Sequence, residues 1–391
     1  MKKTIKEMNL ENKKVIIRCD FNVPIKDGKI LDDARIKKAL PTIEYAITQN
    51  AKIILMSHLG RIKTKEDLEK NNLEIVSGRL TELLKTKVKF INSTRGEELE
   101  KSIYEMKPKD IILIQNTRYE DLIDKKESSN NEELAKYWSS LGDIFINDAF
   151  GTIHRSHASN VGIANNLPSA VGFLVEKELE ALSILDNPPR PFTIILGGSK
   201  VSDKIGVIEN LVTKADYILI GGGMAFTFLK AKGLNIGKSI LDEESLEFCK
   251  SIMKEYPNKI ILPVDIETST EFTDNNRKIL RDISDIKEDE LGLDIGSKTI
   301  ELFNNYIEKS ELVIWNGPLG VYEFDNFKVG TNKVLHNIVE KNIKAILGGG
   351  DSAAAAANEN LSDKIFHVST GGGATLEYLE GKKLPGLEAI K

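Results

Sequence analysis

Short apolar runs recur along the chain, and each is followed by a turn and then by apolar positions at helical spacing. In the first half these runs lie in segments 15–21, 52–58, 87–91, 110–116 and 143–150. In the second half they lie in segments 192–198, 217–223, 259–265, 312–318, 345–350 and 366–373. Strands that alternate with helices form parallel sheets with helices on both faces. The pattern therefore predicts an α/β fold of two doubly wound, Rossmann-like domains with parallel sheets.

The join between the two series falls in segment 165–191. A helical pattern over about 171–186 is closed there by Pro-Pro-Arg-Pro at 188–191, because proline cannot continue a helix. A length of 391 residues suits two domains of roughly 150–200 residues each. We therefore expect an N-terminal domain over 1–170, a hinge helix over 171–186 and a C-terminal domain over 187–377.

Composition narrows the class of protein. The chain has 54 Lys and Arg against 59 Asp and Glu, and the net charge of −5 argues against a general nucleic-acid binder. Cys19 and Cys249 lie far apart without metal-site spacing, which argues against a disulfide or structural zinc and indicates a reducing compartment. The N-terminus lacks the apolar stretch of a signal peptide, and no apolar run approaches the ~18 residues of a membrane span. We expect a cytoplasmic protein with neither a membrane nor a nucleic-acid partner.

The predicted strands end differently in the two halves. In open parallel sheets, ligands bind outside the carboxyl ends of the strands. Strands of the second half end in glycines, at 197–198, 221–223, 348–350 and 371–373. Strands of the first half end in charged or polar residues: Arg18, Asp20, Asn22, His58, Arg61, Arg118 and Asp148. The second half is thus suited to a phosphate chain that approaches backbone amides, and the first half to a small polar anion.

Lys200 and Lys204 follow the Gly197-Gly198 turn at a spacing of four residues, and the segment from Ser199 onward has the pattern of a first helical turn. Cations at a helix N-terminus repel each other and the positive end of the helix dipole. A phosphate is the ligand that best relieves this repulsion. Two solvated surface lysines remain the alternative.

The polar residues of the first half allow two interpretations. Arg18, Asp20 and Asn22 share one face of an extended segment, which a solvated edge strand would also explain. Arginines and histidines recur in the loops that follow: Arg35, Arg61, Arg118, Arg155, His58, His154 and His157. Guanidinium groups match phosphate and carboxylate oxygens in pairs, although any single arginine is more simply a surface residue. His154 and His157 without a carboxylate are a poor zinc signal.

Segment 348–353, Gly-Gly-Gly-Asp-Ser-Ala, opens an Ala-rich helix. Helix capping alone would explain Asp351 and Ser352. The functional interpretation is a nest of amides for phosphate, with Asp351 close to a phosphate-bound Mg²⁺. Two other nucleotide motifs fail: segment 233–239 lacks the Walker spacing, and no acidic residue follows segment 348–353 at the distance that a dinucleotide site needs.

These motifs together resemble one family, phosphoglycerate kinase. The matching segments are RCDFNVP (18–24), DDARI (32–36), MSHLGR (56–61), DAFGTIHRSH (148–157), GGSKVSDKI (197–205), GGGMAFTFLK (221–230), WNGPLGVYE (315–323), GGGDS (348–352) and HVSTGGGA (367–374). They follow the family's order over essentially the whole chain. The resemblance implies a monomeric enzyme of glycolysis and gluconeogenesis. It implies a reversible transfer of a phosphoryl group from ATP to the carboxylate of 3-phosphoglycerate, which gives ADP and 1,3-bisphosphoglycerate. It also implies Mg²⁺ bound to the nucleotide.

The resemblance also implies roles for individual residues. Those expected to bind 3-phosphoglycerate are Asp20, Phe21, Asn22, Arg35, His58, Leu59, Gly60, Arg61, Arg118, His154 and Arg155. Those expected to bind the nucleotide are Gly198, Lys200, Lys204, Gly222, Gly292, Asn316, Glu323, Gly349, Gly350, Asp351 and Ser352, with Asp351 also near the Mg²⁺. Those expected at the transferring phosphoryl group are Arg35, Lys200, Gly371 and Gly372. The family further implies that the C-terminal segment, about 378–391, returns to the N-terminal domain.

The chain departs from the family pattern at a few positions. Ile62 replaces a common proline, segment 115–120 changes but keeps Arg118, Cys19 replaces an aliphatic residue, and Ser352 replaces a frequent threonine. None of these changes removes a charge that the reaction needs. One alternative, a non-catalytic nucleotide-binding scaffold, would lack a lysine or arginine at the transfer point. The other, an NAD(P)-dependent dehydrogenase, would need the dinucleotide motif. The sequence favours neither alternative.

Overall fold

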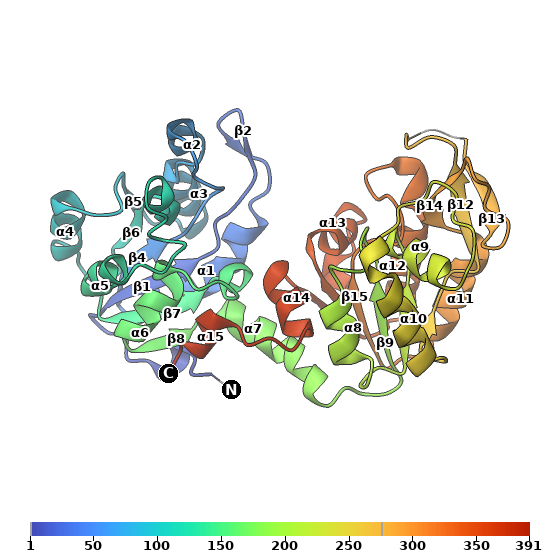
Figure 1. Ribbon diagram of the computed structural model, residues 1–391. Helices are drawn as coiled ribbons and strands as arrows, with labels where there is room; N and C mark the ends of the chain where they lie inside the picture. The colour runs from blue at the N-terminus through green and yellow to red at the C-terminus, as the bar shows by residue number, and fades with distance from the viewer. Residues whose placement is uncertain (1, 275–276) are drawn as a thin grey trace. The chain divides into compact units, whose positions relative to one another are not determined.

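The computed structural model describes residues 2–274 and 277–391, and the chain divides into two compact units (Figure 1). Unit 1 comprises residues 1–180 and 383–391, and unit 2 comprises residues 181–382. Each unit is built around a six-stranded parallel sheet, so the predicted fold class is confirmed. No helix of the described ranges is long and apolar enough to cross a membrane.

The sheet of unit 1 consists of β1 (Lys14–Cys19), β4 (Lys52–Met56), β5 (Val88–Ile91), β6 (Ile111–Ile114), β7 (Ile144–Asp148) and β8 (Ser169–Val171). Their order is β5-β6-β4-β1-β7-β8. Ile17 at the centre of the sheet pairs with Leu55 on one side and Ile146 on the other. Because a parallel sheet is covered on both faces, these strands are nearly continuous runs of β-branched residues.

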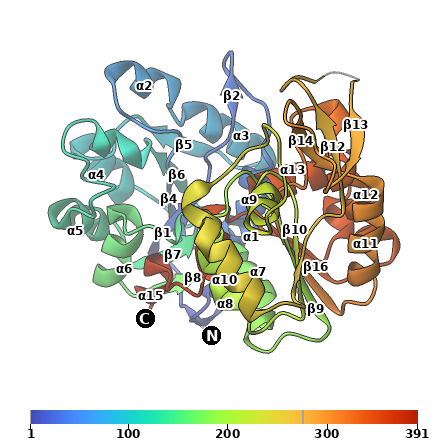
Figure 2. The same cartoon turned by 45° about the vertical axis from the view of Figure 1, so that its right-hand side comes forward.

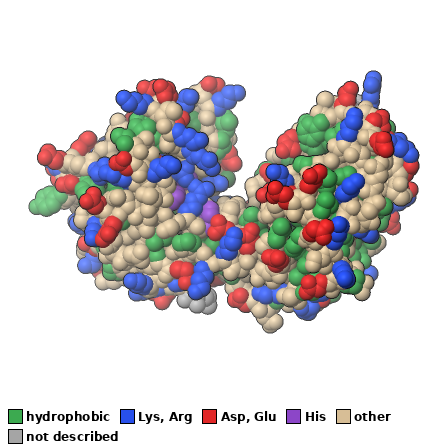
Figure 3. Space-filling model, viewed as in Figure 1, with side chains coloured by type: hydrophobic (Ala, Val, Ile, Leu, Met, Phe, Trp, Pro, Cys, Tyr) green, Lys and Arg blue, Asp and Glu red, His purple; other side chains and the backbone are tan. Residues whose placement is uncertain are grey.

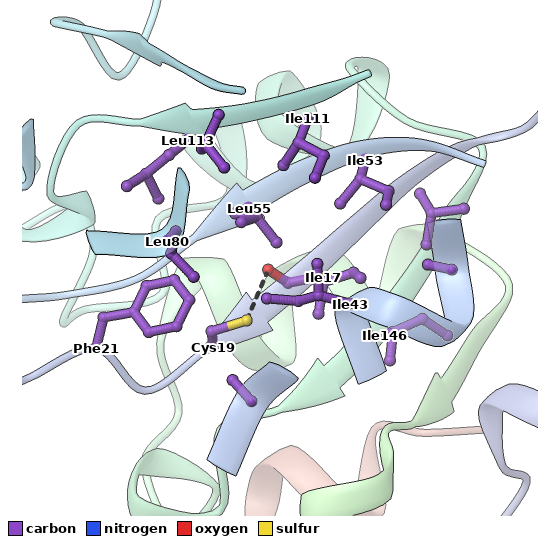
Figure 4. Close-up of a cluster of buried hydrophobic side chains, with 14 of the residues drawn as sticks. Ile17, Cys19, Phe21, Ile43, Ile53, Leu55, Leu80, Ile111, Leu113 and Ile146 are labelled. Carbon is purple, nitrogen blue, oxygen red and sulfur yellow. Dashed lines mark hydrogen bonds between the residues drawn. The ribbon is translucent and has the colours of Figure 1, made fainter. Parts of the chain in front are cut away.

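The helices of unit 1 are α1 (Ala34–Thr48), α2 (Lys65–Lys70), α3 (Glu74–Leu84), α4 (Glu97–Tyr104), α5 (Glu132–Ser140), α6 (Ile163–Asn166), most of α7 (Phe173–Leu182), and α15 (Pro385–Glu388). Between α1, α3 and the sheet lies a buried cluster that includes Ile17, Cys19, Phe21, Ile43 and Leu55 (Figure 4). The short helix α15 is tied to unit 1 through Gly386, whose N–H donates to the carbonyl of Ile153 at 2.8 Å.

The sheet of unit 2 consists of β9 (Phe192–Leu196), β10 (Tyr217–Ile220), β11 (Ile260–Ile261), β15 (Leu312–Asn316), β16 (Ala345–Gly348) and β17 (His367–Val368). Their order, β11-β10-β9-β15-β16-β17, is the 3-2-1-4-5-6 order of dinucleotide-binding folds. The strand order reverses between β9 and β15, and ligands of such sheets bind at that point.

The helices of unit 2 are α8 (Ile205–Leu211), α9 (Met224–Ala231), α10 (Leu246–Glu255), α11 (Ser297–Ile307), α12 (Val329–Glu340), α13 (Gly350–Asn358) and α14 (Gly373–Leu379). Figure 2 shows α8 and α10 on one side of the sheet and α11 and α12 on the other. Helix α14 lies against α8, where Asn210 Nδ2 donates to the carbonyl of Leu379 at 2.8 Å.

Unit 2 also contains an antiparallel sheet, which the sequence pattern did not predict. Its strands are β12 (Asp265–Ser269), β13 (Ile279–Asp282) and β14 (Leu291–Ile295), in the order β13-β12-β14. The strand expected over 259–265 ends at Ile261, because Pro263 cannot donate to a sheet. Asp265 instead begins β12, and its carboxylate accepts from Thr299 N at 2.8 Å in the first turn of α11.

A second unpredicted element is the hairpin of β2 (Ile25–Lys26) and β3 (Lys29–Ile30) in unit 1. Its turn residues Asp27 and Gly28 both have positive φ, at 50° and 70°. An Asp-Gly pair in this conformation forms the two-residue turn typical of hairpins, so the signal was present in the sequence.

The helix expected over 171–186 is shorter than predicted. Val171 is the last residue of β8, α7 begins at Phe173, and a 3-10 turn over Ser183–Asp186 follows its end at Leu182. The late start has a local cause, since Asp148 Oδ1 at the end of β7 accepts from Leu174 N at 2.9 Å and so holds the first turn of α7.

Candidate functional site

The charged site of unit 1 starts from a buried arginine at the carboxyl end of β1. Arg18 has no exposed surface, and its Nε donates to Ser159 Oγ at 2.9 Å. Its Nη1 donates to the carbonyl of Cys19, and its Nη2 lies 3.4 Å from His58 Nδ1. The guanidinium thus connects β1 with the loop after β4 and with the segment after β7.

Two short contacts fix the segment that follows β1. Asp20 Oδ2 accepts from Arg35 Nη1 at 2.6 Å, and Arg35 projects from the first turn of α1 with 41% of its side chain exposed. Asn22 Oδ1 accepts from Gly60 N at 2.9 Å. Residues from three separate segments are therefore held in one place before any ligand binds.

Arg118 approaches the same place from the 3-10 turn after β6. Its Nη1 donates to the carbonyl of Gly60 at 3.0 Å, whereas its buried Nε has no hydrogen-bond partner. Asn116 supports the turn by accepting from Leu59 N and Arg118 N at 3.2 and 3.0 Å. A buried N–H without a partner is costly, so Arg118 has a donor free for an anionic ligand.

The segment after β7 adds two histidines and Arg155. Arg155 Nε lies 3.3 Å from His154 Nε2. Burial, reinforced by nearby arginines, lowers the pKa of His154 to about 4 and that of His157 to about 3, and it lowers the pKa of His58 well below its usual value. At neutral pH the imidazoles are therefore uncharged and the arginines supply the positive charge.

We call this group the basic patch of unit 1. It comprises Arg18, Asp20, Asn22, Arg35, His58, Gly60, Arg118, His154, Arg155 and His157. Figure 3 shows Lys and Arg side chains gathered with His side chains on a flank of unit 1 near β2. The patch combines several fixed donors with a net positive charge, which suits an anion with several oxygens.

The structure places the predicted residues of the first half unequally. Contacts with one another or with Gly60 bring together most of them, whereas Arg61 is exposed on the loop surface. The side chains of Phe21 and Leu59 are buried in unit 1, and Phe21 lies in the core cluster (Figure 4), so only their backbones are close to the patch. Sequence reasoning missed Glu127 and Ser159, which support Arg18, because no motif or strand end marks either residue.

The second candidate site is a cavity of about 330 Å³ in unit 2, at the carboxyl ends of β9, β15 and β16. Its lining comprises Gly197, Gly198, Ser199, Lys200, Asp203, Lys204, Asn316, Gly317, Pro318, Gly349, Gly350, Asp351, Gly372, Gly373 and Leu376. The cavity therefore lies where the strand order of this sheet reverses, as the topology predicts.

Glycine is required in the wall of this cavity for steric reasons. A Cβ on Gly197 would lie 2.0 Å from the carbonyl oxygen of Pro318. Gly198 has a φ of +103° and donates its N–H to the same carbonyl at 3.0 Å. Backbone from two loops thus approaches more closely than any side chain would allow.

Two polar side chains meet inside the cavity. Lys204 Nζ donates to Asn316 Oδ1 at 2.6 Å, and the buried Asn316 Nδ2 has no partner. Burial lowers the pKa of Lys204, while Asp203, Asp351 and Glu380 oppose that shift. The ammonium group and the free amide N–H both offer donors to an anion in the cavity.

The prediction of a helix that starts at Ser199 is wrong. Helix α8 begins at Ile205, and residues 199–204 form turns. Ser202 N donates to Asp242 Oδ2 at 2.8 Å, and Lys204 N donates to the carbonyl of Val201 at 2.8 Å in a turn, so neither amide makes an α-helical bond. Lys200 and Lys204 consequently lie on a loop that lines the cavity rather than on one helical face.

Other predicted residues of the second half lie away from the lining. Gly222, Gly292, Glu323 and Ser352 are not part of it, and Gly371 lies just outside it beside Gly372. The hydroxyl of Ser352 is buried and accepts from Gly317 N at 2.9 Å, so this side chain supports the loop after β15.

Two carboxylates line the cavity, those of Asp203 and Asp351. Asp351 lies exposed in the first turn of α13, and no group of three His, Cys, Asp or Glu that could hold a metal ion exists among residues 2–274 and 277–391. Mg²⁺ commonly binds through one or two carboxylates, phosphate oxygens and water. One or both of these carboxylates would therefore fit such an ion when a phosphorylated ligand brings it.

The two sheets, one ending in a basic patch and the other in a glycine-lined cavity, define a two-unit α/β protein built for phosphorylated ligands. Residues 5–382 match the family model described as Phosphoglycerate kinase. The chain belongs to the phosphoglycerate kinase family.

Individual relatives agree over the full length. A phosphoglycerate kinase of Listeria monocytogenes serotype 4b (strain CLIP80459) is 55% identical over 391 residues, covering 100% of this chain and 99% of the relative. Another from Fusobacterium nucleatum subsp. nucleatum is 55% identical over 395 residues. The structure of phosphoglycerate kinase from Coxiella burnetii matches with a TM-score of 0.90 at 38% identity, covering 100% of this chain and 99% of that chain. The chain is thus an enzyme of glycolysis that transfers a phosphoryl group between ATP and 3-phosphoglycerate.

Proposed function

We propose that the two units divide this reaction, with 3-phosphoglycerate bound by the basic patch of unit 1 and the Mg²⁺–nucleotide bound by the cavity of unit 2. The observation that carries the proposal is the contrast between the two sheet ends, one made of charged side chains and the other of backbone amides. A compact acid with one phosphate suits fixed arginines, whereas an extended phosphate chain suits close approach to glycine backbone.

In unit 1, the phosphate of the acid would lie against Arg118, His154 and Arg155. The exposed side chain of Arg61 would turn from the surface to contact the same phosphate. The free Nε–H of Arg118 supports this placement. Asp20 can only accept hydrogen bonds when ionised, so it suits the hydroxyl of the substrate. Asn22 and His58 would complete the contacts.

In unit 2, the amides around Gly349 and Gly350 would face the nucleotide phosphates, Gly198 would let the phosphates approach the backbone, and Lys204 would neutralise their charge. Asp351 would hold Mg²⁺ together with phosphate oxygens and water, which neutralises charge on the phosphates when the ion is bound. Gly222, Gly292 and Glu323 would lie along the rest of the nucleotide, with Ser352 supporting the phosphate loop from behind.

The chemistry is an in-line displacement. An oxygen of the ionised carboxylate forms a bond to the γ-phosphorus of ATP, and the bond from that phosphorus to the bridging oxygen of ADP breaks. The acid is already ionised at pH 7, so no general base is needed. Arg35, Lys200 and the amides of Gly371 and Gly372 would neutralise the transferring group.

The proposal requires motion, because reacting atoms must approach to about 3–3.5 Å. We propose domain bodies over 1–170 with about 378–391 and over 187–377, with the segment 171–186 as the hinge between them. Closure would also exclude the water that hydrolyses an acyl phosphate. We further propose that the chain acts as a monomer in the cytoplasm. The buried free cysteines Cys19 and Cys249 fit a reducing compartment.

A coupled assay tests the proposal. The native chain is supplied with 3-phosphoglycerate, Mg-ATP, glyceraldehyde-3-phosphate dehydrogenase and NADH, and is compared with Arg35→Ala and Lys200→Ala. Each variant should lose at least about 10²-fold in turnover, as loss of a charge at a phosphoryl-transfer site does. Lys232→Ala, an exposed lysine at the end of α9, serves as the matched control. Undiminished turnover in both variants would remove Arg35 and Lys200 from the transfer site.

A further inference from the structure

A buried carboxylate lies behind the basic patch of unit 1. Glu127, in the segment before α5, has no exposed surface. Ser159 N donates to its Oε2 at 2.9 Å, and Ser159 Oγ donates to its Oε1. Burial raises the pKa of Glu127, while Arg18 and both Ser159 donors favour its ionised form. A carboxylate removed from water persists only when such partners satisfy it.

Glu127 also fixes the backbone of the segment that carries the patch residues. Its carbonyl accepts from Ala158 N at 2.9 Å, and its Oε1 lies 3.8 Å from His157 Nδ1. One residue therefore contacts His157, Ala158 and Ser159 in succession. His154 and Arg155 come directly before these anchored positions.

From Ser159 the contacts continue to the patch itself. Ser159 Oγ donates to Glu127 and accepts from Arg18 Nε at 2.9 Å, so the hydroxyl has a single consistent orientation. Arg18 Nη2 lies 3.4 Å from His58 Nδ1. Because a guanidinium has donors only, His58 Nδ1 must accept, and the ring proton of the neutral imidazole lies on Nε2.

We propose that Glu127 is a positioning residue for the binding of 3-phosphoglycerate. Through Ser159 it orients Arg18, and through Arg18 it holds His58 in the tautomer that offers Nε2–H to an anion. The inference rests on the proposed assignment of 3-phosphoglycerate to unit 1. Glu127 is not expected to touch the substrate, so its effect passes entirely through the hydrogen bonds of Ser159 and Arg18.

Glu127→Gln tests the inference while keeping the side-chain volume. A glutamine offers one acceptor oxygen where Ser159 requires two, so one bond to this segment is lost. We expect the KM for 3-phosphoglycerate to rise about 10-fold or more, as for the loss of a hydrogen bond to a charged group, and the KM for Mg-ATP to stay within about twofold. Glu120→Gln is the matched control, since Glu120 is a nearly buried glutamate of the same unit that is bound to Thr94 and Arg95. This control variant should leave both KM values within about twofold of the native values.

Ring ¹⁵N spectra provide the second readout. The chain has five histidines, and the spectrum of His58→Gln assigns the His58 signals by their loss. Native His58 should show the Nε2–H tautomer, and Glu127→Gln should shift its ring signals, while Glu120→Gln leaves them in place. Ser159→Ala interrupts the same contacts at the next residue and should reproduce both effects if Glu127→Gln fails to fold.

The possible outcomes separate the inference from the assignment on which it rests. Arg118→Ala should raise the KM for 3-phosphoglycerate if unit 1 binds the acid, and no change would remove both the assignment and the inference. If Arg118→Ala raises this KM but Glu127→Gln and Ser159→Ala do not, the positioning role is wrong and the assignment stands. The same holds if Glu127→Gln lowers the KM by removing a negative charge. A native His58 with its proton on Nδ1 would overturn the inference without any variant.

Discussion

The two candidate sites differ in the kind of hydrogen-bond donor that they offer to an anion. In unit 1, the donors are long side chains that a buried network holds in place, as in the contacts of Arg18 with Ser159 and His58. In unit 2, glycine backbone forms much of the cavity wall, and the absence of side chains at Gly197 and Gly198 allows two loops to meet. The first arrangement is therefore sensitive to loss of a charge or a supporting hydrogen bond, and the second to the addition of a single methyl group.

The largest effect is expected from Gly197→Ala. The new Cβ would lie 2.0 Å from the carbonyl oxygen of Pro318, so the loops after β9 and β15 must separate. We expect a loss of about 3 kcal/mol in the free energy of unfolding, as for severe overpacking, together with loss of Mg-ATP binding. Urea unfolding and calorimetry measure the two effects.

Gly350→Ala provides the stability control, because an added Cβ there has no atom within 4 Å. It should change the free energy of unfolding by less than about 1 kcal/mol. Equal losses in the two variants would contradict the claim that close backbone approach, rather than glycine content, shapes the cavity.

The same contrast explains what the sequence could predict. Glycine clusters after apolar runs are visible in the sequence, and residues of the clusters at 197–198, 348–350 and 371–373 line the cavity, whereas those at 221–223 do not. The arginines of unit 1 were visible as well, but the residues that hold them were not. Glu127 lies in a polar stretch, and the residues that it anchors are far along the chain, with Ser159 lying 32 positions away.

The fold shows a similar limit. Apolar runs predicted the parallel strands because burial on both faces favours nearly continuous apolar residues. The antiparallel strands β12, β13 and β14 were missed, since β13 is mostly exposed and has no apolar run. The helix after Gly198 was predicted too early, because the bond from Ser202 N to Asp242 joins residues 40 positions apart and no local pattern records it.

The next prediction concerns the pH dependence of stability and two buried aspartates, one in each unit. Asp148 in unit 1 and Asp294 in unit 2 each lie buried beside a helix start, and burial raises the pKa of both to about 7. The pKa in the unfolded chain is about 3.9, so between pH 4 and pH 7 the folded state binds more protons. The stability that protonation contributes is present below about pH 4 and is lost as the pH rises through about 7.

Asp294→Asn removes this titration in unit 2. Relative to the native chain, its free energy of unfolding should rise by on the order of 2 kcal/mol between pH 4 and pH 7.5, on top of a constant offset from the altered contacts with Gly330 and Ile295. Asp33→Asn is the control of opposite sign, because Lys37 and Arg79 lower the pKa of Asp33, so its difference from the native chain should change only below about pH 4 and stay nearly constant up to pH 7.5. A difference for Asp294→Asn that does not vary with pH would show that this carboxyl titrates normally.

A smaller effect is expected from Lys204→Ala. The variant removes an ammonium group from the cavity but leaves the glycine backbone unchanged, so nucleotide binding should weaken by about tenfold, or ~1.4 kcal/mol, rather than disappear. The KM for 3-phosphoglycerate should stay within about twofold. Steady-state kinetics with each substrate varied in turn decide the point, and an equal rise in both KM values would contradict the division of ligands between the units.

The smallest effect is a gain in stability that should touch neither site. Gly78 lies exposed inside α3 of unit 1, and an added Cβ would have no atom within 4 Å. Gly78→Ala should raise the free energy of unfolding by about 0.5–1 kcal/mol, because alanine loses less backbone freedom in a helix than glycine does. In the Glu127→Gln background, the same substitution should raise the free energy of unfolding by the same amount without lowering the KM for 3-phosphoglycerate. If the KM recovered together with stability, Glu127 would affect unit 1 only through its stability. The side-chain network of unit 1 would then not be needed to orient the donors of that site.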